Sequence, residues 1–123
     1  MKFSFILAAV FLLVSCVSIP EVPKDASVME IVQKGQEATD RDRHNLAIHY
    51  YNLILERFPE DAASICMAEY EIALIHYKQN KLNTAKSEFE NLLKRYEQID
   101  SELLPQEYKI LSGIVLKKIN GKI

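Results

Sequence analysis

A pattern of small, aromatic and aliphatic residues occurs twice in this chain at the same spacing. In each copy a small residue is followed, at identical intervals, by an alanine, an aromatic residue and an aliphatic residue. The first copy is Gly35, Ala47, Tyr51 and Ile54, and the second is Ala73, Ala85, Phe89 and Leu92. Repetition at this distance is typical of architectures in which each repeat is one supersecondary unit. The repeat therefore constrains the fold more than any other feature of the sequence.

The segments that carry the repeat have helical periodicity. From Val28 onward strong helix formers dominate, and alternating runs typical of strands are few. Apolar spacing and helix breakers predict five helices, over about 28–39, 44–57, 61–79, 83–97 and 105–119. Pro59 ends the second helix, and Asn120-Gly121 forms a good cap after the fifth. We predict an all-α fold whose short turns make neighbouring helices antiparallel. The third helix is apolar around most of its circumference and should pack on several sides.

The repeated pattern resembles the tetratricopeptide (TPR) repeat, in which small residues let two helices approach closely while an aromatic ring fills the space behind. The matching alanines, Ala47 and Ala85, lie about one helical turn farther apart than in the usual repeat, and a longer third helix explains the difference. Glu97 stands where the family often has proline. Gly113 and Asn120 repeat the spacing of Ala73 and Asn80, so the fifth helix is expected to cap the stack. The resemblance implies two TPR-like hairpins plus a capping helix in a short right-handed solenoid.

The second half of this pattern has a more particular resemblance. The segment ERFPEDAASICMAEYEIALIHYKQNKLNTAKSEFENLLKRYE is similar to the lengthened repeats of outer membrane lipoproteins of the BamD type. Those proteins are the helical-repeat subunits of the machinery that assembles β-barrels. They have about five repeats, whereas this chain has two and a half. The resemblance implies a role in cell-envelope assembly.

The first fifteen residues are predicted to be a lipoprotein signal peptide. Lys2 supplies a positive charge, and the apolar run 3–14 is too short for a membrane span of roughly 20 residues. The run closes with Leu13-Val14-Ser15-Cys16, which resembles the lipobox of bacterial lipoproteins. That resemblance implies cleavage before Cys16 and attachment of diacylglycerol to its sulfur, giving a membrane anchor. The alternative is an ordinary secretory signal with a cysteine near its cleavage site.

Residues 16–27 are predicted to be the lipidated cysteine and a flexible tether, and residues 28–123 the helical domain. Pro20 and Pro23 and the lack of helical periodicity favour a tether. Val17 stands where the enterobacterial sorting pattern has aspartate in proteins kept at the inner membrane. The predicted location is therefore the periplasmic face of the outer membrane, or the cytoplasmic membrane in an organism without an outer one.

Composition excludes several classes of function. Without Lys2, 14 basic residues remain against 17 acidic ones, so nothing indicates a nucleic-acid partner. The mature chain would be large enough for one modest core. Cys66 lies in an apolar stretch, where it is either a small buried hydrophobe or a thiol with a redox or intermolecular role.

The sequence has no motif for catalysis or metal binding. No two histidines have the four-residue spacing that places two metal ligands on one helix face. Cys66 and His76 lie ten residues apart on one predicted helix, roughly 15 Å along its axis, too far for a nucleophile and its base. There is no glycine-rich phosphate loop. We therefore predict no enzymatic activity, no cofactor and no metal site.

The predicted functional site is a partner-binding groove on the first helices of the repeats, since proteins of this family bind through that concave surface. The groove residues would be Met29, Val32, Gln36, Met67, Tyr70, Leu74, Tyr77, Ile110 and Ile114, with Lys117 at one end. Methionine and tyrosine suit adaptable protein contacts. The family's lysine and asparagine clamp for carboxy-terminal peptides is missing at the matching positions.

The expected function is a membrane-anchored, non-enzymatic scaffold that binds protein partners of the cell envelope, in a process resembling outer membrane β-barrel assembly. One alternative is a TPR-type pilotin that escorts secretin subunits. Another is a carrier of a small hydrophobic ligand in the same apolar groove. A homodimer is also possible, because short repeat stacks expose core residues at their ends.

Overall fold

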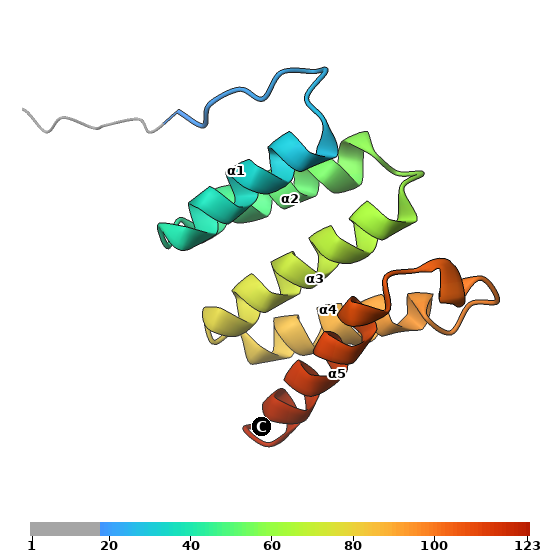
Figure 1. Ribbon diagram of the computed structural model, residues 1–123. Coiled ribbons are helices and arrows are strands. Elements are labelled where there is room, and N and C mark those ends of the chain that lie inside the picture. The colour runs from blue at the N-terminus through green and yellow to red at the C-terminus, as the bar shows by residue number, and fades with distance from the viewer. Residues whose placement is uncertain (1–17) are drawn as a thin grey trace, which may run out of the picture.

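A computed structural model describes residues 18–123, which form five α-helices and one short 3-10 helix (Figure 1). The α-helices are α1 (Val28–Asp40), α2 (His44–Arg57), α3 (Ala62–Lys78), α4 (Leu82–Arg95) and α5 (Gln106–Asn120). The all-α prediction is confirmed, and each predicted helix end lies within two residues of the observed one. The 3-10 helix η1 (Ser101–Leu103) was not predicted. The predicted signal peptide and Cys16 lie outside the described residues.

Side-chain caps fix the start of two helices. At α1 the hydroxyl of Ser27 accepts the backbone N–H of Glu30, and the Glu30 carboxylate accepts the N–H of Ser27 at 2.7 Å. This reciprocal capping box satisfies two donors that the first turn would otherwise leave unpaired. At α3 the carboxylate of Asp61 accepts the N–H of Ser64 at 3.1 Å. The Ser27 bonds hold the pKa of the Glu30 carboxyl below its ordinary range. The pKa of the Asp61 carboxyl is lowered chiefly by the Ser64 hydroxyl, which donates to it at 2.6 Å, and then by the Ser64 N–H.

The turn between α1 and α2 has the same structure as the turn between α3 and α4. Asp42 and Asn80 both adopt a left-handed backbone, with φ of 54° and 60°, which aspartate and asparagine tolerate better than most residues. The N–H of Arg43 donates to Ala38 O at 2.8 Å, and that of Lys81 donates to His76 O at 2.9 Å. The two hairpins are therefore closed by the same local structure.

Within the first hairpin, α1 and α2 approach closely where Gly35 meets Tyr51. A Cβ atom on Gly35 would lie 2.8 Å from Cζ of the Tyr51 ring. The ring is 1% exposed and packs among Ile31, Ala47 and Ile54. Glycine at this position leaves the space that the aromatic ring occupies.

Helix α3 is the centre of the molecule and packs against α2, α4 and α5. It has buried residues on several sides, as its sequence predicts. Its contacts join two core clusters, one around α1 and α2 and the other around α4 and α5. On the outer side Arg95 of α4 donates two hydrogen bonds, of 2.8 and 2.6 Å, to the carboxylate of Glu69 on α3.

The link to α5 turns back immediately after α4 ends at Arg95. The hydroxyl of Tyr96 donates to Pro105 O at 2.7 Å, which holds the start of α5 against the end of α4. The side-chain amide of Gln106 donates to the carbonyls of Ser101 and Leu104. Ser112 of α5 is fully buried, and its hydroxyl has no hydrogen-bond partner among the described residues.

Residues 22–27, the carboxyl-terminal part of the segment before α1, are packed against the domain. The prediction of a flexible tether therefore needs correction for these residues. Val22 is 4% exposed and Ala26 7% exposed, and both belong to the core around α1 and α2. The Arg57 guanidinium donates to Pro23 O at 2.7 Å and to Val22 O at 3.1 Å. Residues 22–27 are therefore held by burial and by a forked hydrogen bond from α2.

Candidate functional site

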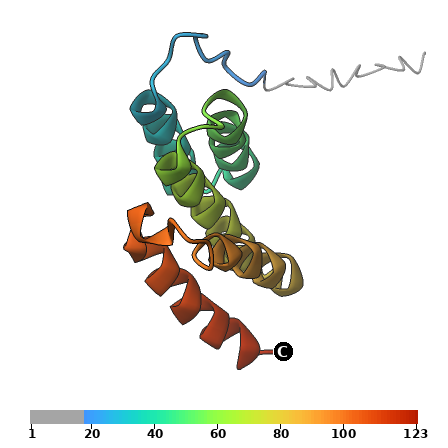
Figure 2. The same cartoon turned by 90° about the vertical axis from the view of Figure 1, so that its right-hand side faces the viewer.

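The predicted groove residues lie on α1, α3 and α5. In Figure 2, α1 and α5 lie on the left and α2 and α4 on the right, with α3 running between them. Helices α1 and α5 are therefore on the same side, whereas α3 lies between the two sides. The three rows of predicted residues differ sharply in exposure.

On α1, one apolar side chain of the predicted row is open to solvent. Met29 is 73% exposed, Gln36 is also exposed, and Val32 is half-buried against the first core cluster. An unbranched thioether can adapt to irregular partner surfaces. Met29 is therefore the α1 residue best placed for contact with a partner.

On α3, the placement of Tyr70 in an open groove is corrected by the structure. Tyr70 is 7% exposed, and its ring centroid lies 5.8 Å from that of Phe89 and 5.4 Å from that of Tyr108. These tilted contacts are typical of aromatic packing in a core. Helix α5 covers Tyr70 with Tyr108, so this residue joins α3, α4 and α5 instead of meeting a ligand.

The other α3 residues of the groove lie half-buried at the edges of the two core clusters. Met67 packs against the first cluster, and Leu74 and Tyr77 against the second. Lys122 donates to the Tyr77 hydroxyl at 3.1 Å, and its Nζ lies 4.8 Å from the ring centroid. The carboxy-terminal turn after α5 thus covers one face of Tyr77.

On α5, the predicted row is the most exposed apolar surface of the three. Ile110 is 61% exposed and Ile114 is 46% exposed. Leu111 is 39% exposed on the same helix, and sequence reasoning missed it. A Cβ on Gly113 would meet no atom within 4 Å. The surface around Gly113 is therefore open.

Sequence reasoning also missed an acidic group on the central helix. Glu71 lies between the apolar residues Tyr70 and Ile72, and burial raises the pKa of its carboxyl while Lys78 partly offsets the rise. Its charge also raises the pKa values of the Tyr51, Tyr70 and Tyr108 hydroxyls, although burial is the larger cause for each. No ion pair to Glu71 occurs within residues 18–123. The signal in the sequence that could have identified Glu71 was a glutamate between apolar residues.

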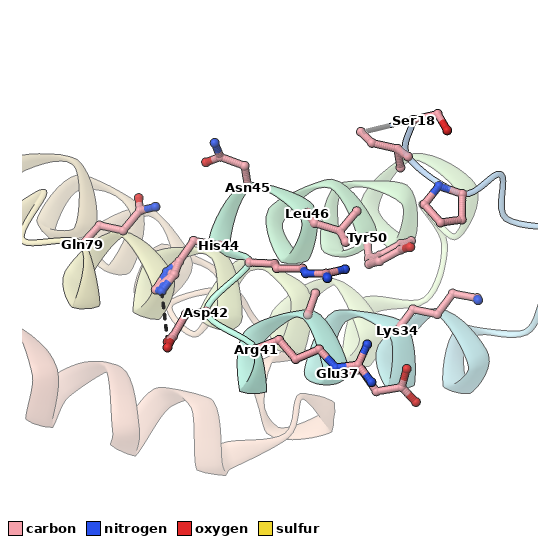
Figure 3. Close-up of a pocket in the computed structure, with 14 residues that line it drawn as sticks. Ser18, Lys34, Glu37, Arg41, Asp42, His44, Asn45, Leu46, Tyr50 and Gln79 are labelled. Atoms are coloured by element: carbon pink, nitrogen blue, oxygen red, sulfur yellow. Dashed lines mark ion pairs between the residues drawn. The ribbon is translucent and has the colours of Figure 1, made fainter. Parts of the chain in front are cut away.

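An open cavity of about 960 Å³ lies where the segment before α1 passes the α1–α2 turn (Figure 3). Its lining includes Ser18, Lys34, Arg41, Arg43, His44 and Tyr50. The imidazole Nδ1 of His44 is buried without a hydrogen-bond partner among the described residues, while its Nε2 lies 3.8 Å from Asp42. Residues 18–20 also line this cavity, which sequence periodicity alone does not indicate.

The remaining residues with possible chemistry do not form a shared site among the described residues. Cys66 is fully buried, and burial raises the pKa of its thiol, as expected for a small core residue. His76 Nδ1 lies 2.7 Å from the carboxylate of Glu88. Within residues 18–123 no group of three potential ligands could hold a metal ion. In the same residues no helix combines the length and apolar character that crossing a bilayer requires.

By its fold the chain is a small all-helical protein whose five helices pack in sequence as antiparallel neighbours. An uncharacterized protein of Treponema pallidum (strain Nichols) is 32% identical to it over 119 residues, covering 94% of this chain and 48% of the Treponema protein. The chain thus spans about half the length of that relative. No family model and no solved structure matches the chain.

Proposed function

We propose that this protein is a lipid-anchored, non-enzymatic scaffold of the TPR type that binds protein partners in the cell envelope. The observation that carries the proposal is the repetition of one hairpin, in sequence and in structure. The proposed location is the periplasmic face of the outer membrane. Its setting, by resemblance to BamD-type lipoproteins, is an assembly process such as β-barrel insertion.

The repeat assignment rests on two agreements between the hairpins. Both turns place an aspartate or asparagine in the left-handed region and close with equivalent backbone hydrogen bonds. In the first hairpin the aromatic ring lies directly over the small residue, and in the second the corresponding Ala73 and Phe89 are fully buried. These features support two repeats followed by α5 as a capping helix, in a short right-handed solenoid.

The anchor is proposed from the sequence, since Cys16 lies outside the described residues. A lipobox after a short apolar run supports it, and two or more acyl chains give stable attachment to a bilayer. Replacing Cys16 with serine should leave the helical fold unchanged and move the protein from the membrane fraction to the soluble fraction. Retention of the Cys16→Ser variant in washed membranes would contradict the anchor.

Partner binding is assigned to the exposed apolar side chains on the side shared by α1 and α5. Met29 and Ile114 project from the surface, so arginine at either position should leave the core intact and weaken contact with a partner. The test compares proteins crosslinked to the Met29→Arg and Ile114→Arg variants in membranes with those crosslinked to Asn91→Arg, a control at an exposed position of α4. The same proteins recovered in equal amounts from all three would refute this surface.

A further inference from the structure

Helix α5 exposes the small residue that the corresponding helices bury. Gly35 lies under the Tyr51 ring in the first hairpin, and Ala73 is fully buried in the second. Gly113 occupies the matching position by its spacing to Asn120, yet a Cβ there would meet nothing within 4 Å. Within residues 18–123 no helix follows α5 to cover it. The position that receives an aromatic ring in the first repeat is therefore open in α5.

The surface around Gly113 has the apolar character of a helix-packing face. Ile110, Leu111 and Ile114 are 61%, 39% and 46% exposed, and they lie within three residues of the glycine. Contiguous exposed apolar side chains on a soluble domain commonly mark a protein-binding surface. A glycine among them permits close approach of a second helix, as it does between α1 and α2.

Charge on α5 indicates the kind of partner. Helix α5 and the turn after it carry Lys109, Lys117, Lys118 and Lys122 against a single carboxylate, Glu107. In the described part of the chain, none of these four lysines forms an ion pair. Two copies of this face would bring like charges together, whereas an acidic helix would complement it. Charge thus disfavours a second copy of the chain.

We propose that α5 docks an acidic amphipathic helix of a protein partner, which seats an aromatic ring on Gly113 as Tyr51 is seated on Gly35. The partner helix would take the place of the second helix in a third hairpin. Its apolar side would cover Ile110 and Ile114, and its acidic flanks would meet the lysines. This inference rests on the proposed protein-binding role but is independent of the lipid anchor.

The binding test uses a labelled peptide with the sequence of residues 82–97, in which Lys86→Glu, Lys94→Glu and Arg95→Glu supply acidic flanks around Phe89. Its fluorescence anisotropy is titrated with the purified full chain. We expect this peptide to bind at least tenfold more tightly than either of two controls, the same acidic peptide with Phe89→Ala and the peptide with its original basic residues. No binding by the acidic peptide, or equal binding by all three, would overturn the proposal.

The matched variants of the protein are Gly113→Leu and Lys118→Glu. The Cβ of this leucine would meet no atom within 4 Å, so circular dichroism should be unchanged, while the larger side chain occupies the space over Gly113 and peptide affinity falls at least tenfold. Lys118→Glu should reduce the preference for the acidic peptide. If the Gly113→Leu variant binds the acidic peptide as tightly as the parent protein does, the proposed packing of an aromatic ring on Gly113 is refuted. A concentration-dependent dimer that Gly113→Leu dissociates in sedimentation would also refute it, because the occupant would be a second copy. Binding by a chain that does not associate with membranes would overturn the anchor alone.

Discussion

Adding one methyl group should have opposite effects at Gly35 and Gly113, although the two residues hold corresponding positions in the repeated sequence pattern. In an exposed helix, alanine in place of glycine stabilises by roughly 0.5–1 kcal/mol, because the unfolded chain loses freedom. At Gly113 a Cβ meets no atom within 4 Å, so Gly113→Ala should gain about this amount.

At Gly35 the same methyl group would collide with the Tyr51 ring. The Cβ would lie 2.8, 3.0 and 3.2 Å from Cζ, Cε1 and Cε2 of that ring, and the ring is 1% exposed. A close-packed ring cannot retreat without displacing its neighbours, and overpacking of this kind costs about 1–3 kcal/mol. After the helix gain is subtracted, Gly35→Ala should lower the free energy of unfolding by about 1 kcal/mol, and by at most about 2.5 kcal/mol. The helix gain is common to both variants, so they should differ from each other by the overpacking cost of about 1–3 kcal/mol.

Urea unfolding followed by far-ultraviolet circular dichroism measures both changes. The control is a Tyr51→Leu background, in which the ring is absent and Gly35→Ala should cost little or nothing. That double-mutant cycle isolates the contact between the two positions. A Gly35→Ala variant as stable as the parent, or one equally destabilised in both backgrounds, would refute the close approach of α1 and α2 at this glycine.

Three further predictions concern single groups. Ser112→Ala removes a buried hydroxyl without a partner among the described residues and should raise the free energy of unfolding by about 1 kcal/mol, so a lower midpoint in urea would count against its burial. Arg57→Lys cannot reproduce the forked bond to Val22 and Pro23 and should speed proteolytic cleavage within residues 20–27, whereas Arg41→Lys should not. Burial raises the pKa of Glu71, so the charged form is disfavoured in the folded state. The associated stability is present below the unfolded pKa and is lost as pH rises through the folded pKa. Glu71→Gln should therefore stabilise the protein more at pH 7 than at pH 4, and the reverse order in urea unfolding would contradict the assignment.

The helices and the first hairpin contact could be predicted because their signals are local or repeated. Pro59 ends α2, and the resemblance to the TPR repeat predicted a close approach at Gly35 with the Tyr51 ring filling the space behind it. The capping box at Ser27 and Glu30 was not predicted, although serine followed three residues later by glutamate is a known helix start. Each of these features depends on residues within one hairpin.

The corrections concern contacts between elements that local patterns do not specify. Tyr70 has the spacing of a groove residue, and only the position of α5 puts Tyr108 over it. Residues 22–27 lack periodicity, which favours a tether, yet Arg57 near the end of α2 holds two of their carbonyls. Hydrogen bonds to backbone carbonyls leave no mark in the sequence of the acceptor segment. Such contacts can be recognised only once the tertiary fold is known.

The docking of residues 22–27 changes how the proposed anchor would position the domain. Six residue steps separate Cys16 from the docked Val22, and a fully extended chain of that length reaches about 22 Å. An acylated Cys16 would therefore hold Val22, and the end of α2 that Arg57 joins to it, within about this reach of the lipid headgroups. Helix α5 lies at the other end of the stack (Figure 1). Because α3 and α4 separate α5 from this end of the domain, a partner could bind the surface around Gly113 without displacing the docked residues 22–27.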